Sequence, residues 1–266
     1  MAENVIPEKQ KPFVGCLTRI GVSLYMIEKS QAIVLHTVRC ATGSTLARLY
    51  TERRGIMTVS LPGSKSKGAV RKSIFQPFSL LEMEIEFREN KEIQRVVEAH
   101  VATVSHTILS HPGKLAISLF MSELVTKTVQ QREPDQQLFT FLQRSIELLD
   151  LSEEGIANFH LLFMCRLSIH LGFFPHTDGM NDAYCFDLLN GRFIPSVPSH
   201  PHYCKGIEMN LLSRLLQTGF TNVQELSLNR DERNLLIDLL LNYYRLHIGP
   251  MAEIRSLDVL RTLFST

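Results

Sequence analysis

The residues of this chain whose types and spacing suggest a chemistry are the lysines and arginines that follow Arg53. Between Arg53 and Leu81 the chain carries basic residues but no aspartate or glutamate, although its formal net charge is only +1. A local positive surface of this kind can neutralise the phosphate groups of a nucleic acid. Basic runs are also common on solvated faces that bind nothing. With neighbouring arginines included, the candidate DNA contacts are Arg39, Arg48, Arg53, Arg54, Lys65, Lys67, Arg71 and Lys72.

The basic segment could instead belong to an enzyme, but the sequence contains no complete catalytic motif. Gly63-Ser64-Lys65-Ser66 lacks glycines at the two positions that a phosphate-binding loop requires. Ser64 and Lys67 match one pattern of β-lactamase-like enzymes, but the two companion motifs of those enzymes are missing. His-Glu-x-x-His, Gly-x-Ser-x-Gly and Gly-x-Gly-x-x-Gly are also absent from the sequence. We therefore predict that the chain is not an enzyme and needs no cofactor.

Histidines and cysteines between positions 172 and 205 form a candidate metal-binding site. Imidazole nitrogen and thiolate sulfur are the ligands that zinc prefers. The paired two-residue spacing of a zinc knuckle is missing, so we predict a metal-free loop. A metal-dependent enzyme centred on His176 to Cys204 remains an alternative. The candidate ligands are His176, Cys185, His200, His202 and Cys204.

The cysteine content and the N-terminal residues predict a protein of the reducing cytoplasm. The chain has five cysteines, an odd number, without a Cys-x-x-Cys pair, so a disulfide framework is not expected. Phe13-Val14-Gly15-Cys16 resembles the end of a lipoprotein signal, but charged residues and prolines precede it where an apolar region is required. The longest apolar region, Phe159 to Phe174, is too short and too polar for a membrane span.

Five short runs in the first part of the chain predict β-strands, because they are rich in β-branched and aliphatic residues and partly alternate apolar with polar. The acid-free loop Pro62 to Pro77 lies between the third and fourth runs. Five strands with a basic loop are typical of an OB-fold, which binds single strands through a positive groove and aromatic stacking. Tyr50, Phe75 and Phe78 are candidates for stacking or for the core. The runs are Ala32–Arg39, Ser44–Thr51, Gly55–Leu61, Phe78–Phe87 and Ile93–Val104.

Helical spacing of apolar residues replaces the strand pattern after about Ser105. It lapses between Gly172 and Cys204, where Asn190-Gly191 predicts a hairpin. The fold class is therefore α+β, a five-stranded OB-fold barrel followed by an all-α domain with a hairpin excursion. We predict an N-terminal extension at 1–28, the barrel at 29–105 and a helical domain at 106–266 with the excursion at 172–205. The helices are expected at Lys114–Gln131, Asp135–Leu149, Ile156–Leu171, Glu208–Gln217, Arg230–His247 and Ile254–Phe264.

Several stretches, taken in order, resemble the RecO family of bacterial DNA repair proteins. In the barrel they are Ile33 to Thr37, Arg48 to Glu52 with Gly55, Gly63 to Lys67, and Gln76-Pro77-Phe78 leading into Leu80-Leu81-Glu82. Near the end they are Leu240 to His247 and Ile254 to Leu257. The resemblance runs from about Lys29 to Phe264, and its strength lies in the order and spacing of these stretches.

The resemblance implies a non-enzymatic recombination mediator. Such proteins bind single- and double-stranded DNA, dock on the acidic C-terminal tail of single-strand-binding protein, pair with RecR, promote annealing and help to load RecA. Some members carry a four-cysteine zinc motif where this chain has only Cys185 and Cys204, so zinc is not expected here. For the tail peptide we expect an apolar pocket with a basic rim, for which Arg132, Arg144 and Arg166 are candidates. A pure protein-interaction scaffold remains a further alternative, and the cytoplasm, close to the nucleoid, is the expected location.

Overall fold

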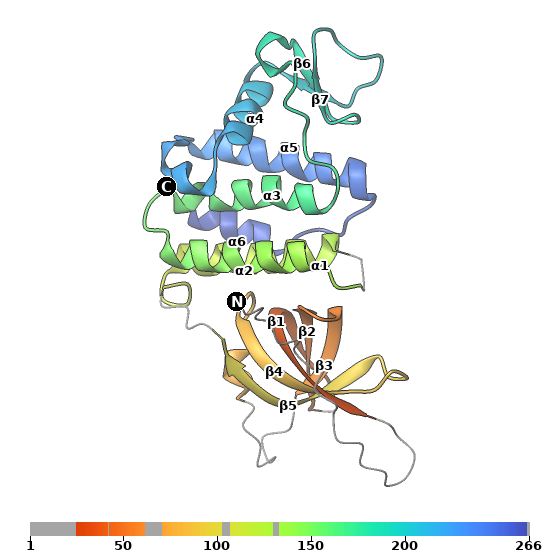
Figure 1. Cartoon of the computed structure of the whole chain (residues 1–266). Coiled ribbons are helices and arrows are strands. Elements are labelled where there is room, and N and C mark those ends of the chain that lie inside the picture. The colour runs from red at the N-terminus through yellow and green to blue at the C-terminus, as the bar shows by residue number, and fades with distance from the viewer. Residues whose placement is uncertain (1–24, 42, 62–70, 103–106, 130–132, 265–266) are drawn as a thin grey trace, which may run out of the picture.

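The computed structural model describes residues 25–41, 43–61, 71–102, 107–129 and 133–264. A barrel stands at one end, layers of helices cover it, and a small sheet lies at the far end (Figure 1). The strands of the barrel are β1 (Met26–Arg39), β2 (Thr45–Thr51), β3 (Gly55–Leu61), β4 (Leu80–Phe87) and β5 (Ile93–Val101). The α-helices are α1 (Pro112–Thr128), α2 (Gln136–Leu151), α3 (Phe159–His170), α4 (Ile207–Gln217), α5 (Arg230–Ile248) and α6 (Ser256–Leu263).

The barrel is closed in the order β1-β2-β3-β5-β4, which confirms the predicted five-stranded, OB-like architecture. Its pairs are antiparallel except for β3 and β5, which run parallel. Alternate residues of each strand point inward, so a small apolar core fills the barrel. The same alternation places the intervening residues of β2, β3 and β4 on the outside, where the candidate site lies.

Strand β1 joins the barrel to the helices because it is buried on both faces. Ala32 and Val34 belong to the barrel core, whereas Ile33 and Leu35 belong to the core shared with the helices. This explains why the sequence here is a continuous apolar run instead of an alternating one. The Ser122 hydroxyl of α1 also donates a hydrogen bond to the Leu35 carbonyl, so α1 is fixed directly on this strand.

Two predicted strand starts are wrong. Strand β1 begins at Met26, so it includes residues assigned to the extension, because charged and exposed residues obscured its alternation. The rest of that extension, residues 1–24, lies outside the described residues. Strand β4 begins at Leu80, because Phe78 has a φ of 63°, which no strand residue adopts.

The helices form as expected where capping residues mark their starts. The Asp135 carboxylate accepts hydrogen bonds from the N–H groups of Gln137 and Leu138 at the start of α2. Asn229 and Glu232 form a reciprocal capping box at the start of α5.

The helix predicted at Ile156–Leu171 begins with the 3-10 turn η2 (Ile156–Asn158), which precedes α3. A Cβ at Gly155 (φ 66°) would lie 2.9 Å from the Gln224 nitrogen, so this turn needs glycine. No helix in the described part of the chain is long and apolar enough to cross a membrane.

The excursion folds as a three-stranded sheet in the order β7-β6-β8, from β6 (Cys185–Asp187), β7 (Arg192–Ile194) and β8 (Tyr203–Lys205). The predicted hairpin is confirmed, with Phe186 opposite Phe193 and Gly191 at a φ of 62°. Strand β8 was not predicted, because its three residues are too few to show a pattern.

Candidate nucleic-acid interface and peptide pocket

The outer surface of β2 and β3 is the candidate nucleic-acid interface, since this is the surface with which OB-folds bind oligonucleotides. Residues on the two strands that face outward alternate with those of the barrel core. Cross-strand pairing places Arg48 beside Thr58 and Leu46 beside Ser60. We call this surface the β2–β3 face, and its residues are Leu46, Arg48, Thr58 and Ser60.

Arg48 supplies the positive charge in the middle of the β2–β3 face. It is half-buried and pairs across the strands with His36 of β1. Burial, and then the charge of Arg48, lower the pKa of His36, so the imidazole is neutral at physiological pH. The Arg48 Nε is buried without a hydrogen-bond partner among the described residues. The guanidinium charge is therefore not balanced by a described carboxylate.

A second group of basic residues lies at one end of the β2–β3 face. Arg39 ends β1 opposite Thr45, and the Lys72 Nζ lies 3.3 Å from the Thr45 hydroxyl. Arg39, Arg71 and Lys72 are all exposed. Lys65 and Lys67, from the predicted loop, lie outside the described residues. The structure thus brings Arg39 and Lys72 together beside the start of β2.

Arg53 and Arg54 lie in the β2–β3 turn, at the opposite end of β2 from Arg39. Nε and Nη2 of Arg54 donate hydrogen bonds of 3.1 and 2.9 Å to one oxygen of Glu28. The same guanidinium stands 4.1 Å from the centre of the Phe87 ring. The charge of Arg54 is therefore balanced within the barrel, whereas Arg53 is exposed.

The outer surface of β4 carries several carboxylates. Glu82, Glu84 and Glu86 alternate along β4 with residues of the barrel core, and Glu98 of β5 pairs with Glu84. Lys29 forms an ion pair of 2.9 Å with Glu84, and Glu86 is paired with Arg88 and Arg95, so these carboxylates are partly balanced. A polyanion is therefore attracted less to this side of the barrel than to the side of Arg48.

The aromatic residues that the sequence offered for base stacking belong to the core. Tyr50, Phe75 and Phe78 are each at most 2% exposed. Burial raises the pKa of Tyr50 to about 12, and its hydroxyl lies 3.4 Å from the Asp135 carbonyl, to which it donates. Phe78 packs edge-on against Phe163 of α3. They join the barrel and the helices or fill the barrel, so the stacking interpretation is wrong.

The candidate metal ligands are not assembled. No group of three or more histidine, cysteine, aspartate or glutamate side chains in the described part of the chain could hold a metal ion. Cys185 and Cys204 are buried on adjacent strands, and burial raises the pKa of Cys204 to about 12. His200 lies 3.4 Å from the Asp187 carboxylate. The excursion is held by an apolar core and hydrogen bonds.

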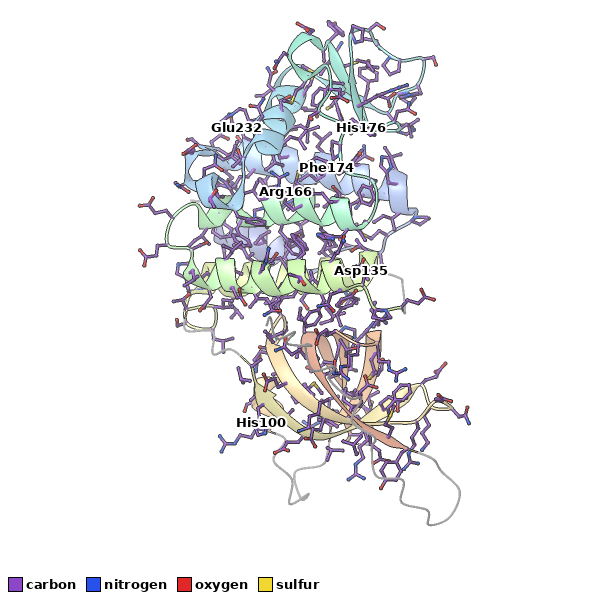
Figure 2. The ribbon with its side chains drawn as sticks, viewed as in Figure 1. His100, Asp135, Arg166, Phe174, His176 and Glu232 are labelled. Carbon is purple, nitrogen blue, oxygen red and sulfur yellow. The ribbon has the colours of Figure 1, made fainter. Side chains whose placement is uncertain are left out.

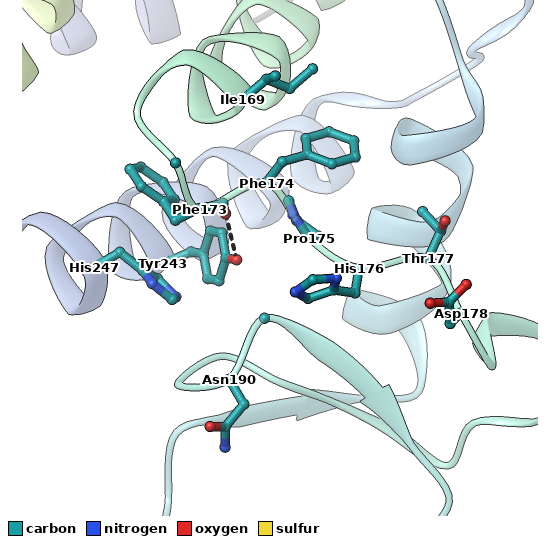
Figure 3. A pocket seen from close by; sticks show the side chains of 12 residues that line it. Ile169, Phe173, Phe174, Pro175, His176, Thr177, Asp178, Asn190, Tyr243 and His247 are labelled. Atoms are coloured by element: carbon teal, nitrogen blue, oxygen red, sulfur yellow. Dashed lines mark hydrogen bonds between the residues drawn. The ribbon is translucent and has the colours of Figure 1, made fainter.

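A pocket of about 590 Å³ lies between the end of α3, the excursion and α5 (Figure 3). One wall is aromatic, where the Tyr243 hydroxyl donates a 2.7 Å hydrogen bond to the Phe173 carbonyl and Phe173 stacks on His247. The polar side chains of Thr177, Asp178 and Asn190 line another part. Gly191 closes one side, where a Cβ would lie 2.5 Å from the Tyr243 oxygen. A volume and lining of this kind suit an apolar side chain or a small ligand. Spacing alone did not predict this pocket, because its residues come from separate elements.

Of the two described arginines suggested for partner binding, Arg166 contacts a residue that lines this pocket. Its guanidinium stands 5.7 Å from the ring centre of Phe174, which lines the pocket, and donates a hydrogen bond to the Thr218 carbonyl. Arg166 and Phe174 are both labelled in Figure 2. Arg144 is exposed on α2 and is not part of the pocket lining. Arg132 lies outside the described residues. The structure therefore places one of the three arginines at the pocket's edge.

The closed OB-like barrel, with a helical domain packed on it, defines a two-part protein of the oligonucleotide-binding barrel class. Two family models match these parts, Recombination protein O N terminal over residues 26–104 and Recombination protein O C terminal over residues 109–257. The chain belongs to the RecO family, a family of DNA repair and recombination proteins.

Curated relatives agree with this assignment. DNA repair protein RecO of Bacteroides fragilis is 35% identical over 242 residues, and that of Azobacteroides pseudotrichonymphae is 32% identical over 240 residues. Each alignment covers 90% of this chain and 100% of the relative. The chain is therefore similar to these DNA repair proteins across both of its parts.

Proposed function

We propose that this chain is a non-catalytic recombination mediator that binds single- and double-stranded DNA on the β2–β3 face. Arg48 contacts phosphates in the middle of the face, and Arg39, Arg71 and Lys72 contact them at its end. Arg53 adds positive charge in the β2–β3 turn, and Lys65 and Lys67 are proposed as further phosphate contacts from their charge in the sequence alone. The charge of Arg54 is balanced by Glu28, so its contribution is smaller.

The observation that carries this proposal is the uneven placement of charge on the barrel. Carboxylates line the outer surface of β4 and are partly paired with Lys29, Arg88 and Arg95, whereas Arg48 has no described carboxylate partner, so a polyanion is favoured on the side of Arg48 and Lys72. Each neutralised phosphate releases counterions, so affinity depends strongly on salt. Two complementary strands held on such a surface repel each other less, which is a physical basis for annealing without ATP.

We also propose that the pocket at the end of α3 receives the acidic C-terminal tail of single-strand-binding protein. An apolar residue of the tail enters beside Phe173 and Phe174, and Arg166 at the edge attracts the acidic residues. Pairing with RecR and loading of RecA complete the role, in the cytoplasm and near the nucleoid. The family to which the chain belongs supports these partners.

Charge reversal tests the proposed DNA face. Arg48→Glu combined with Lys72→Glu is expected to weaken binding of a labelled single strand by about 10- to 100-fold at physiological salt, because two phosphate contacts become repulsive. Arg245→Glu is the matched control, since Arg245 is exposed on α5 and far along the chain from the barrel. Fluorescence anisotropy measures all three proteins, and circular dichroism checks that each variant is folded.

Equal affinity of the double variant and the parent would remove DNA binding from the β2–β3 face. If the parent bound a partner protein but no DNA, the chain would be a pure protein-interaction scaffold instead. Stoichiometric zinc in purified protein, retained through dialysis, would instead favour the metal-dependent alternative centred on His176 to Cys204.

A further inference from the structure

A small cavity between α3, α5 and α6 is lined by residues whose buried nitrogens lack a hydrogen-bond partner among the described residues. Two buried side-chain nitrogens that line it, Nδ1 of His160 and Nε of Arg261, have no partner among the described residues. Buried polar groups are almost always paired, so two unpaired atoms at one cavity require an explanation. An arginine Nε–H can only donate, so the missing partner is an acceptor.

The charge of the cavity indicates which kind of acceptor it takes. Its described lining contains three arginines and no acidic residue, and it consists of His160, Arg230, Arg233, Asn234, Ile237, Leu260, Arg261 and Phe264. Arg261 is paired with Asp238, but Arg233 donates only to the carbonyls of Leu228 and Phe264. Two guanidinium charges therefore remain without a described carboxylate.

His160 is suited to donate to an anion without adding charge. It is 2% exposed and packs edge-on against Phe120. Burial, followed by the charge of Arg233, lowers its pKa to about 3, so the imidazole is neutral at physiological pH. In the tautomer that carries hydrogen on Nδ1, the ring donates a hydrogen bond and leaves the positive charge to the arginines.

The size of the cavity limits what enters it. The enclosed volume of about 10 Å³ holds roughly one water-sized atom. A single anionic oxygen fits this space, while the remainder of the group lies at the mouth, where Arg230 is exposed. A tetrahedral oxyanion can direct separate oxygens to guanidinium groups in different directions, whereas a carboxylate has two oxygens in one plane.

We propose that this cavity binds a phosphate group, with one oxygen between Arg233, Arg261 and His160 and the others facing Arg230. The phosphate comes either from solution or from the backbone of a DNA strand. In the second case the helical domain holds a strand at a site separate from the β2–β3 face. The proposal does not depend on the barrel, because inorganic phosphate probes the cavity directly.

Calorimetric titration of the full chain with inorganic phosphate, at constant ionic strength, tests the proposal. Saturable binding is expected for the parent, with affinity at least about ten-fold lower in Arg230→Gln and in Arg261→Gln, each of which removes a charged donor. Arg245 lies on α5 with Arg230 but does not line the cavity, so Arg245→Gln is expected to bind phosphate like the parent. Thermal unfolding with and without phosphate shows whether each variant is folded.

A short single-stranded oligonucleotide distinguishes the two sources of the phosphate. The competition uses a protein that carries Arg48→Glu and Lys72→Glu, so that the β2–β3 face no longer binds the oligonucleotide. If the oligonucleotide releases the bound phosphate, the cavity binds a DNA strand. If it does not, the cavity binds free phosphate. The absence of saturable binding would show that the donors hold only water and would overturn the proposal. Equal binding by all variants, or displacement of phosphate by an acidic peptide but not by excess sulfate, would also overturn it.

Discussion

Phe78 shows at the scale of one residue how the two parts of the molecule are joined. Its left-handed backbone is strained for a residue other than glycine, by about 1–3 kcal/mol. Complete burial of a phenylalanine ring stabilises by about 1.5–3 kcal/mol, and an edge-on aromatic pair adds about 0.5–1.5 kcal/mol. The ring packs on Phe163 in the shared core, and the Phe78 N–H donates to the Val34 carbonyl. Burial therefore offsets the strain.

Glu123 of α1 fixes the start of α6 by accepting from the Ser256 hydroxyl and from the N–H groups of Arg255 and Ser256. Burial alone would raise the Glu123 pKa, but hydrogen bonds from Lys127, Ser256 and Arg255 outweigh it and lower the pKa to about 2. A depressed carboxyl pKa stabilises the folded state above the unfolded value of 4.5, and this stability is lost as pH falls towards 2.

Glu123→Gln should therefore lower the free energy of unfolding by about 1–2 kcal/mol at pH 7, after allowance for the partial exposure of the carboxylate. The difference between variant and parent should shrink as the pH falls from 4.5 towards 2. Urea unfolding at a series of pH values measures it. Glu154→Gln, an exposed control after α2, should show no such dependence, and a constant difference at every pH would contradict the account.

At the scale of elements, the peptide pocket exists only because α3, α5 and the excursion meet. Phe174→Ala is expected to weaken binding of the acidic tail peptide about ten-fold, since the lost contact is worth about 1.4 kcal/mol or more. Tyr184→Ala removes an exposed aromatic ring of the excursion outside the pocket and should bind like the parent. Calorimetric titration compares the three proteins, and equal weakening in both variants would assign the tail to another surface.

The elements that the sequence predicts are those whose own residues carry the signal. Asn190-Gly191 predicted the hairpin through its backbone preferences, and the helical spacing of apolar residues predicted α2 and α5, whose starts are capped by Asp135 and by the Asn229–Glu232 box. The start of β1 and the existence of β8 depend on pairing with distant strands. The cavity of His160 and Arg261 likewise depends on packing of separate helices, so spacing along the chain could not indicate it.

At the scale of the whole molecule, the net charge is only +1, but the fold gathers basic side chains at particular places on the barrel. The described members of the predicted basic set lie at three places: the middle of β2, its beginning, and the distant turn at Arg54. Composition could identify these residues as basic, but only strand pairing shows that Glu28 balances Arg54 while Arg48 lacks a described carboxylate. The β2–β3 face is therefore the side of the barrel that favours a polyanion.

The central claim is that a DNA strand lies on the β2–β3 face, and the salt dependence of binding tests it most directly. The slope of log affinity against log salt for single-stranded DNA falls by about 0.7 for each phosphate contact that is lost. Arg48→Gln combined with Lys72→Gln should therefore reduce the magnitude of the slope by about 1.4, whereas Arg245→Gln should leave it unchanged. A slope in the double variant equal to that of the parent would contradict the account.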